Sequence, residues 1–270
     1  MSQKTTPLVI VENLRVERDR VILSKIDWTM NSNERWVILG ANGSGKTSLL
    51  SVLTGYLAET RGRVTICGAT RGEYDWRELR KRVGLVSNVL IRMIEPDEPA
   101  LSVVVGGRDA KLNLWIEPTD AERRMAITLM RRTECTKVAK QPWSTLSQGE
   151  RQRVLIARSL FSGLDVLILD EPCSGLDPVS REHFLKMLDR IGKGPKAVPL
   201  VLVTHHVEEI TPLFTHVLMI RKGRVLAAGK IGEVLTSENL SALFDAKIKL
   251  RKDRHRYTLN VESYRIKKKR

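Results

Sequence analysis

A glycine-rich octapeptide with the pattern G-x-x-x-x-G-K-T most constrains how this chain can fold. It follows the apolar run Trp36–Leu39 and precedes an apolar-rich segment that begins at Ser48. Its residues are Gly40, Ala41, Asn42, Gly43, Ser44, Gly45, Lys46 and Thr47. Glycines let the backbone turn successive N–H groups toward phosphate oxygens, and the start of a helix adds the positive end of its dipole. The order strand, loop, helix therefore predicts a phosphate-binding loop.

Three residues at the end of this loop carry specific expectations. Lys46 supplies a cation for the β- and γ-phosphates of a nucleotide, and the Thr47 hydroxyl is expected to bind Mg²⁺. Ser48 completes the predicted nucleotide-binding set. The alternative is a glycine-rich turn that binds nothing, and the flanking strand and helix disfavour it.

Composition restricts the class of protein. The chain has 270 residues, of which 42% are apolar, and this suffices for one large domain or two small ones with a buried core. No apolar run approaches the roughly 18 residues that a membrane span requires. The N-terminal residues lack the features of a signal peptide. Cys67, Cys135 and Cys173 have no disulfide or zinc spacing, which is typical of a reducing cytosol.

The net charge of +15 is unusually basic, and much of it lies at the C-terminal end. From Asp245 to Arg270 the balance of charges is +8. Such a segment can bind nucleic acid, anionic lipid or an acidic partner, or it can be a solvated, poorly ordered end without a specific role. The sequence leaves these alternatives open.

Apolar runs and helical spacings alternate along most of the chain, which predicts a parallel sheet covered on both faces by helices. Strands are expected at 8–11, 21–23, 26–30, 36–39, 63–67, 83–86, 165–169 and 200–204, with a hairpin formed by 217–220 and 225–228 around Lys222 and Gly223. Helices are expected at 48–53, 73–82, 119–133, 148–162 and 179–191. In the helix 119–133 the partial periodicity involves Ala121, Met125, Ile127, Leu129 and Met130.

A second motif, Asp165–Pro172, consists of an apolar strand that ends in two carboxylates. Parallel sheets place their chemistry at the carboxyl ends of the strands. We therefore expect Asp170 near Mg²⁺, through water, and Glu171 as the general base that polarises an attacking water. The alternative, a strand ending in solvated acids, would be preferred for this segment alone.

Three further segments complete the pattern. Ser147 begins a helix in the sequence Leu146–Glu150, where a helix start could bind an anion or could simply be capped. Ser174–Pro178 is a turn shortly after the acidic pair, and Val203–His206 ends an apolar strand. A histidine at a strand end is more often structural, but here an imidazole could contact a γ-phosphate.

In chain order these five segments are the phosphate loop, Leu146–Glu150, Asp165–Pro172, Ser174–Pro178 and Val203–His206. Taken together and in that order, they resemble the ATP-binding cassette (ABC) family over about residues 8 to 235. The resemblance implies a P-loop NTPase fold of the α/β class: a RecA-like core with a parallel sheet, an antiparallel β-subdomain and a helical subdomain. It places the ATPase domain at 1–245, with the core at 1–88 and 161–235, the helical subdomain at 89–160 and a basic tail at 246–270.

The resemblance also implies that two cassettes meet head to tail around ATP. Ser147 and Gly149 would then contact the γ-phosphate bound by the partner, Asp177 would line the seam between the two cassettes, and His205 rather than His206 would hold the γ-phosphate. Catalysis would fall to Glu171, His205 and Lys46.

Three departures from the family's pattern bear on the site. Gln148 and Glu150 replace the usual glycine and glutamine of the signature LSGGQ, although the serine and the second glycine remain. Asn88 stands where a glutamine usually helps to ligate Mg²⁺, and its shorter amide joins Thr47 and Asp170 as a predicted ligand. No aromatic residue precedes Trp28 to stack on adenine, so Arg18 is the candidate for that role, with Arg15 as an alternative.

The sequence therefore predicts a Mg²⁺-dependent ATPase subunit that dimerises on ATP and drives a membrane permease on a separate chain. We expect it in the cytoplasm, peripheral to the inner face of a membrane, as a homodimer of cassettes. The alternative is a soluble cassette ATPase that acts on nucleic acid or a ribosome through the basic tail. A third hypothesis, a non-hydrolysing binding module, is disfavoured by the presence of Lys46, Asp170, Glu171 and His205.

Overall fold

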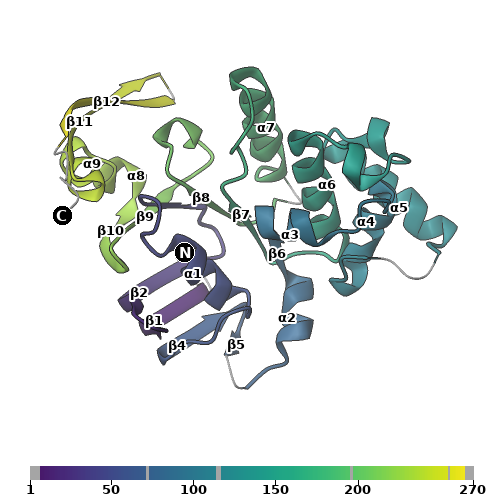
Figure 1. The fold of residues 1–270 in the computed structure, drawn as a ribbon, viewed down its shortest axis with the longest axis horizontal. Helices are drawn as coiled ribbons and strands as arrows, with labels where there is room; N and C mark the ends of the chain where they lie inside the picture. Colours follow the sequence, from purple (N-terminus) through teal and green to yellow (C-terminus); the bar gives the residue numbers. More distant parts are fainter. Residues whose placement is uncertain (1–6, 71–72, 114–116, 195–196, 255, 265–270) are drawn as a thin grey trace, which may run out of the picture. The chain divides into compact units, whose positions relative to one another are not determined.

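The structure is a computed structural model, and it describes residues 7–70, 73–113, 117–194, 197–254 and 256–264. The chain divides into two compact units, one of residues 1–71 and 201–270 and the other of residues 72–200 (Figure 1). Among the described residues, no helix combines the length and the apolar character needed to cross a membrane.

The first unit contains an antiparallel sheet of the order β2-β1-β4-β5. Its strands are β1 (Pro7–Glu17), β2 (Val21–Asn31), β4 (Arg61–Ile66) and β5 (Ala69–Thr70). Two separate strands were expected between residues 21 and 30, and this was wrong, since β2 runs through the polar pair Ser24-Lys25. Lys25 adopts a φ of 53°, and the pairing of β1 with β2 is irregular on either side of Leu14 and Val16. A bulge thus accommodates the polar residues without ending the strand.

The second sheet of this unit places a buried strand beside parallel neighbours. β3 (Trp36–Leu39) pairs in parallel with β8 (Leu200–Thr204) and with β9 (His216–Arg221), and β9 pairs antiparallel with β10 (Arg224–Lys230). All four residues of β3 are buried, as expected for a strand covered on both faces. The predicted hairpin is confirmed, and Lys222 and Gly223 turn it with φ values of 49° and 73°.

The C-terminal end of the first unit is folded. After α1 (Lys46–Leu53), whose helix was predicted, the unit ends with α8 (Ile231–Val234), α9 (Ser237–Phe244) and a hairpin of β11 (Ala246–Asp253) and β12 (Arg256–Tyr264) (Figure 1). Ile248 is buried, and its N–H donates to Ser241 Oγ on α9 at 3.0 Å. Arg256 Nη1 donates to the carbonyl of Glu208 at 3.3 Å. The alternative of a poorly ordered tail is therefore wrong for 246–254 and 256–264, while 265–270 lie outside the described residues.

The second unit combines a parallel strand pair with a run of helices. β6 (Val83–Val86) pairs in parallel with β7 (Val166–Asp170). Between these strands the described residues form α3 (Asn88–Met93), α4 (Ala100–Val105), α5 (Asp120–Arg132) and α6 (Gln148–Phe161), with short 3₁₀ turns. α2 (Trp76–Arg82) precedes β6, and α7 (Pro178–Ile191) follows β7. The strand prediction for 83–86 is confirmed to the residue.

Helix α5 is present as predicted, although not all residues of the partial periodicity lie on its buried face. Its start at Thr119 is confirmed by a capping box, in which the side chains of Thr119 and Glu122 each bond to the other residue's backbone N–H. Its buried face consists of Ala126, Leu129 and Met130, whereas Met125 is 46% exposed and Ala121 is also exposed. The partial periodicity included residues from the solvent face because Ala and Met occur on both faces of helices.

Candidate functional site

The phosphate loop forms the predicted bridge between β3 and α1. Lys46 is 5% exposed, and its Nζ donates to the carbonyls of Gly40 at 2.8 Å and Ala41 at 3.2 Å. These carbonyls orient the ammonium group within the loop. Ser44 N donates to Ala41 O at 3.1 Å, while Ser44 Oγ is buried without a hydrogen-bond partner. A buried, unpaired hydroxyl beside an oriented cation fits a phosphate oxygen as its missing partner.

The glycines of the loop are required by sterics. Gly45 has a φ of 107°, and a Cβ there would lie 2.6 Å from Leu23 Cδ2. A Cβ at Gly40 would lie 2.5 Å from the carbonyl oxygen of Ile220. The turn between β9 and β10 supports the loop, since Gly223 N donates to Ser44 O at 2.9 Å. Residues some 180 positions apart in the sequence thus hold the loop in place.

His205 lies at the same sheet edge as the loop. Leu39 pairs with Thr204 in the parallel register, so Gly40 and His205 follow directly on adjacent strands. The His205 ring is half-buried, and its centroid lies 4.0 Å from that of His206. The exposed His206 donates its N–H to Thr204 Oγ1 at 3.0 Å. The structure therefore brings His205 to the strand end next to the loop.

Arg18 lies in the exposed turn between β1 and β2. The alternative adenine-stacking candidate, Arg15, is engaged by Glu17, with 2.8 Å between Arg15 Nη2 and Glu17 Oε2. The start of β2 packs against the phosphate loop through Leu23, and this places the turn at the loop's side of the first unit. The role of Arg18 at the adenine stays a prediction.

In the second unit, the acidic motif ends β7 with an unusual backbone. Asp170 is the last residue of the strand, and Glu171 adopts a left-handed conformation with a φ of 49°. For a residue with a side chain this conformation costs about 1–3 kcal/mol and is concentrated at functional sites. No feature of the sequence signals it. The roles of Asp170 and Glu171 stay predictions.

Asn88 lies beside this motif. Val86 pairs with Leu169 in the parallel register, so Ser87 and Asp170 occupy neighbouring strand ends. Ser87 caps α3 by accepting a hydrogen bond from Leu90 N at 3.4 Å, and Asn88 begins the helix. Carboxylate, amide and hydroxyl oxygens are ligands that Mg²⁺ accepts. The donor set of Asp170 and Asn88 fits this ion; the third predicted ligand, Thr47, belongs to the first unit and is exposed there.

The segment Ser147–Glu150 begins α6 as predicted. Ser147 caps the helix by accepting from Glu150 N at 3.4 Å, and Glu150 Oε2 accepts from Ser147 N at 2.8 Å and from Ser147 Oγ at 2.7 Å. Ser147 and Glu150 thus form a complete capping box, in which glutamate rather than the family's usual glutamine occupies the third position of the helix.

A hollow of about 300 Å³ adjoins this helix start and contains residues of α6, of the turn after β7 and of α7. Asp177 caps α7 by accepting from Val179 N at 2.9 Å and Ser180 N at 3.0 Å. Hydrogen bonds from the Ser180 hydroxyl and backbone hold the pKa of Asp177 below its usual value. The structure therefore brings Ser147, Gly149 and Asp177 to one surface.

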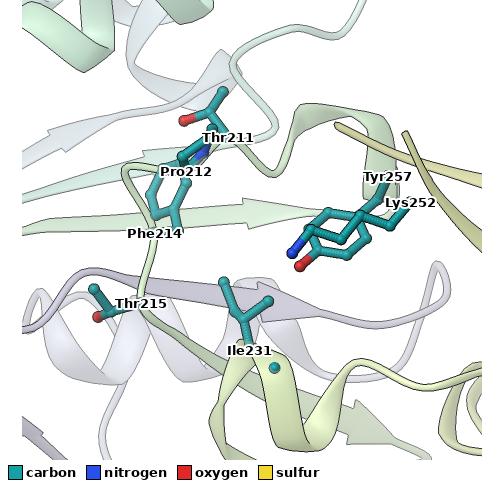
Figure 2. A pocket seen from close by; sticks show the side chains of 8 residues that line it. Thr211, Pro212, Phe214, Thr215, Ile231, Lys252 and Tyr257 are labelled. Carbon is teal, nitrogen blue, oxygen red and sulfur yellow. The ribbon is translucent and has the colours of Figure 1, made fainter. Parts of the chain in front are cut away.

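A second hollow of about 250 Å³ lies in the first unit against the C-terminal hairpin. Figure 2 shows Lys252 and Tyr257 side by side, with Thr211, Pro212 and Phe214 opposite them and Ile231 below. The Lys252 ammonium lies 5.4 Å from the centroid of the Tyr257 ring. None of the predicted site residues lines this hollow, and the sequence contained no signal for it.

The fold and the phosphate loop define a P-loop nucleotide-binding protein of the α/β class. The model of the family described as "ABC transporter" matches residues 23–174. YlmA, an ABC transporter ATP-binding protein of Bacillus subtilis, is 38% identical over 240 residues, which are 88% of this chain and 91% of the relative.

Solved structures agree with this assignment. The chain is 25% identical to cbiO1 of Clostridium perfringens, part of the ABC transporter complex cbiONQ, with a TM-score of 0.74 over 87% of this chain and 93% of that one. A dimeric bacterial ABC transporter cassette shares the fold at 22% identity, with a TM-score of 0.72 over 83% of this chain and 98% of that one.

The chain belongs to the ABC transporter family and is an ATP-binding protein of that family. The predicted family, fold class and role as the ATP-binding subunit of a transporter are thereby confirmed.

Proposed function

We propose that this cassette hydrolyses ATP between two head-to-tail copies and that the cycle powers a separate permease. The observation that carries the proposal is the phosphate loop, in which Lys46 is oriented by two neutral carbonyls and α1 begins without a side-chain cap. An uncapped helix start leaves its N–H groups for an anion. The predicted nucleotide-binding residues, Gly40 to Ser48 with Arg18 at the adenine, form the primary site.

The partner cassette completes the site. The surface formed by Ser147, Gly149 and Asp177 contains an exposed helix start and an exposed carboxylate. The dimeric cassette of similar fold supports a second copy as the partner. In this arrangement Ser147 and Gly149 bind the γ-phosphate held by the other copy.

Mg²⁺ is the proposed cofactor, with Thr47, Asp170 and Asn88 as the residues that hold it, directly or through water. When bound, the ion would supply positive charge that offsets the negative charge of the triphosphate. Glu171 accepts a proton from the attacking water, Lys46 stabilises the phosphate charge and His205 holds the γ-phosphate and that water.

A permease is the proposed membrane partner, and α3 is the proposed contact. Val89 and Met93 are four residues apart on this helix and are 62% and 52% exposed. Residues four apart lie on one face of a helix, so the two side chains form an apolar spot next to Asn88. Docking there would connect Asn88, a proposed Mg²⁺ ligand, to the permease. It would also place the chain at the inner face of the membrane. Closure over two ATP molecules then supplies differential binding free energy to the permease.

The Glu171→Gln variant tests this function. The amide cannot accept the proton, so hydrolysis should fall by about 10²–10⁴-fold while ATP still binds. The variant should accumulate as a dimer in gel filtration with ATP. Glu233→Gln, which changes an exposed carboxylate on α8, is the control and should hydrolyse ATP normally. A Glu171→Gln protein that binds ATP but remains monomeric at all concentrations would contradict the head-to-tail arrangement.

A second candidate function, action on nucleic acid, is favoured by the charge of the C-terminal hairpin. Lys247, Lys249 and Arg251 alternate along β11 and are all exposed, so they share one face. Deletion of 246–270 would also remove the buried Ile248, and replacing the three basic residues by glutamine is the cleaner test. RNA or DNA binding that is steeply salt-dependent, is lost in this triple variant and stimulates hydrolysis would favour this function over transport.

A further inference from the structure

Gln148, the first residue of α6, contacts a turn that is far along the chain. Its Nε2 donates to the carbonyl of Ser174 at 2.5 Å. The two residues are 26 positions apart, and the turn that contains Ser174 connects β7 to α7. The side-chain amide of Gln148 therefore links the start of α6 directly to the turn that leads to Asp177.

The same side chain fills the space above Gly175. Gly175 has a φ of 77°, and a Cβ at this position would overlap Gln148 Oε1 and lie 3.1 Å from Gln148 Cδ. The glutamine thus lies directly against the backbone of the turn. A second contact supports it, since a Cβ at Gly149 would lie 3.3 Å from Leu176 Cδ2. Backbone of each segment is packed against a side chain of the other.

These two contacts join the start of α6 to the turn 174–177, and both segments contain residues predicted to face the partner cassette. Ser147 and Gly149 flank Gln148 at the helix start, and Asp177 follows Leu176 in the turn. Asp177 in turn accepts from two N–H groups of α7, which fixes the end of the turn. The helix start, the turn and the start of α7 therefore form one continuous, internally bonded surface around the hollow described above.

We propose that Gln148 is a positioning residue, which holds the turn 174–177 against the start of α6 before the partner's nucleotide arrives. The proposal rests on the proposed head-to-tail dimer. A surface whose segments are already ordered loses less conformational freedom when it binds. Gln148 therefore raises the affinity of one ATP-bound cassette for the other without touching the nucleotide in its own cassette.

The test compares dimerisation in the Glu171→Gln background, where hydrolysis does not interfere. Gln148→Ala should weaken the ATP-dependent dimer by about three- to tenfold in sedimentation equilibrium, as loss of one ordered contact would. ATP affinity of the monomer should not change. Gln141→Ala, an exposed glutamine of the same unit, is the matched control and should dimerise like the parent.

A second variant distinguishes the effect of the Gln148 hydrogen bond from the effect of the side chain's volume. Gln148→Glu keeps the size of the side chain but removes the N–H donor and points a carboxylate at the Ser174 carbonyl. It should weaken the dimer at least as much as Gln148→Ala, and amide hydrogen exchange in residues 174–177 should become faster in both variants. A merely space-filling role predicts that Gln148→Glu dimerises like the parent.

The outcomes distinguish the two levels of the proposal. If the Glu171→Gln parent forms no dimer with ATP, the proposed function fails. If the parent dimerises and all three glutamine variants have the same dimer affinity, only the positioning role of Gln148 is overturned. Faster exchange in 174–177 without a change in affinity likewise overturns it.

Discussion

Two helices of this protein begin at predicted phosphate sites, and they begin in opposite ways. Helix α1 has Gly45 at its N-cap, in a left-handed conformation, with no side-chain cap and no acidic residue in its first turn. Helix α6 has Ser147 at its N-cap, with a complete capping box from Glu150. The start of α1 therefore has no side-chain cap, whereas the start of α6 is capped by hydrogen bonds to its own side chains.

This difference indicates how the two sites are used. The first N–H groups of any helix lack intrahelical partners, and at α1 they remain for a ligand. At α6 the Ser147 hydroxyl and two N–H groups already have partners, and a carboxylate stands where a phosphate would approach. The loop at α1 is therefore suited to bind nucleotide in a single cassette. In the proposed head-to-tail dimer, the phosphate bound by the partner would have to displace Glu150 from Ser147 at the start of α6.

The largest expected effect is the loss of ATP affinity when the uncapped start of α1 is altered. Lys46→Ala removes the cation while leaving the glycine backbone in place, and ATP affinity should fall by about 10- to 100-fold, because a hydrogen bond to a charged group contributes about 1.5–3 kcal/mol. Isothermal titration calorimetry with ATP measures the change. Lys140→Ala, an exposed lysine of the other unit, should bind ATP like the parent. Unchanged affinity in Lys46→Ala would mean that the loop does not bind phosphate as described.

The capped helix start should respond in the opposite direction to loss of a charge. Glu150→Gln retains a side chain that serves in capping boxes but removes the negative charge from the predicted phosphate contact. In the Glu171→Gln background, the ATP-dependent dimer should become about two- to fivefold tighter at low ionic strength, and the gain should shrink as salt is added. Monomer ATP affinity should stay the same. A dimer that weakens in Glu150→Gln would show that the carboxylate supports the contact rather than competing with phosphate.

The smallest effect concerns acid, and it extends the comparison to α7. Because its folded-state pKa is lowered, the ionised cap of Asp177 stabilises the fold above about pH 4, and this contribution is lost as the pH falls through the depressed pKa. The amide resonances of Val179 and Ser180 should move in that range in an NMR titration. Helix α1 has no acidic residue in its first turn and should show no such local change.

The matched variant for this titration is Asp177→Asn, since asparagine also caps helices but does not ionise. Its Val179 and Ser180 resonances should be insensitive to acid until the whole protein unfolds. Persistence of the same titration in the variant would assign it to another carboxylate.

Features built from consecutive residues were predictable from the sequence. The strands at 36–39, 83–86 and 200–204 were located to the residue, because a buried strand is a run of apolar side chains. The glycine loop lies between strand and helix as predicted, since it needs glycine at particular backbone angles, but α1 begins at Lys46 rather than at Ser48. The left-handed Glu171 and the bulge at Lys25 escaped prediction, since neither residue type prefers a positive φ. The C-terminal hairpin was obscured by its charge, although Ile248 is its buried anchor.

By itself the sequence determined the class of site: a phosphate loop, an acidic strand end and a serine at a helix start, each specified by neighbouring residues. Only the tertiary structure decided which distant residues support each of these segments. Gly223 supports Ser44, Arg256 bonds to Glu208, and Gln148 bonds to Ser174. Local backbone preferences and hydrophobic period act over a few residues, whereas contacts across tens of residues depend on how the elements pack, and no short stretch of sequence encodes that packing.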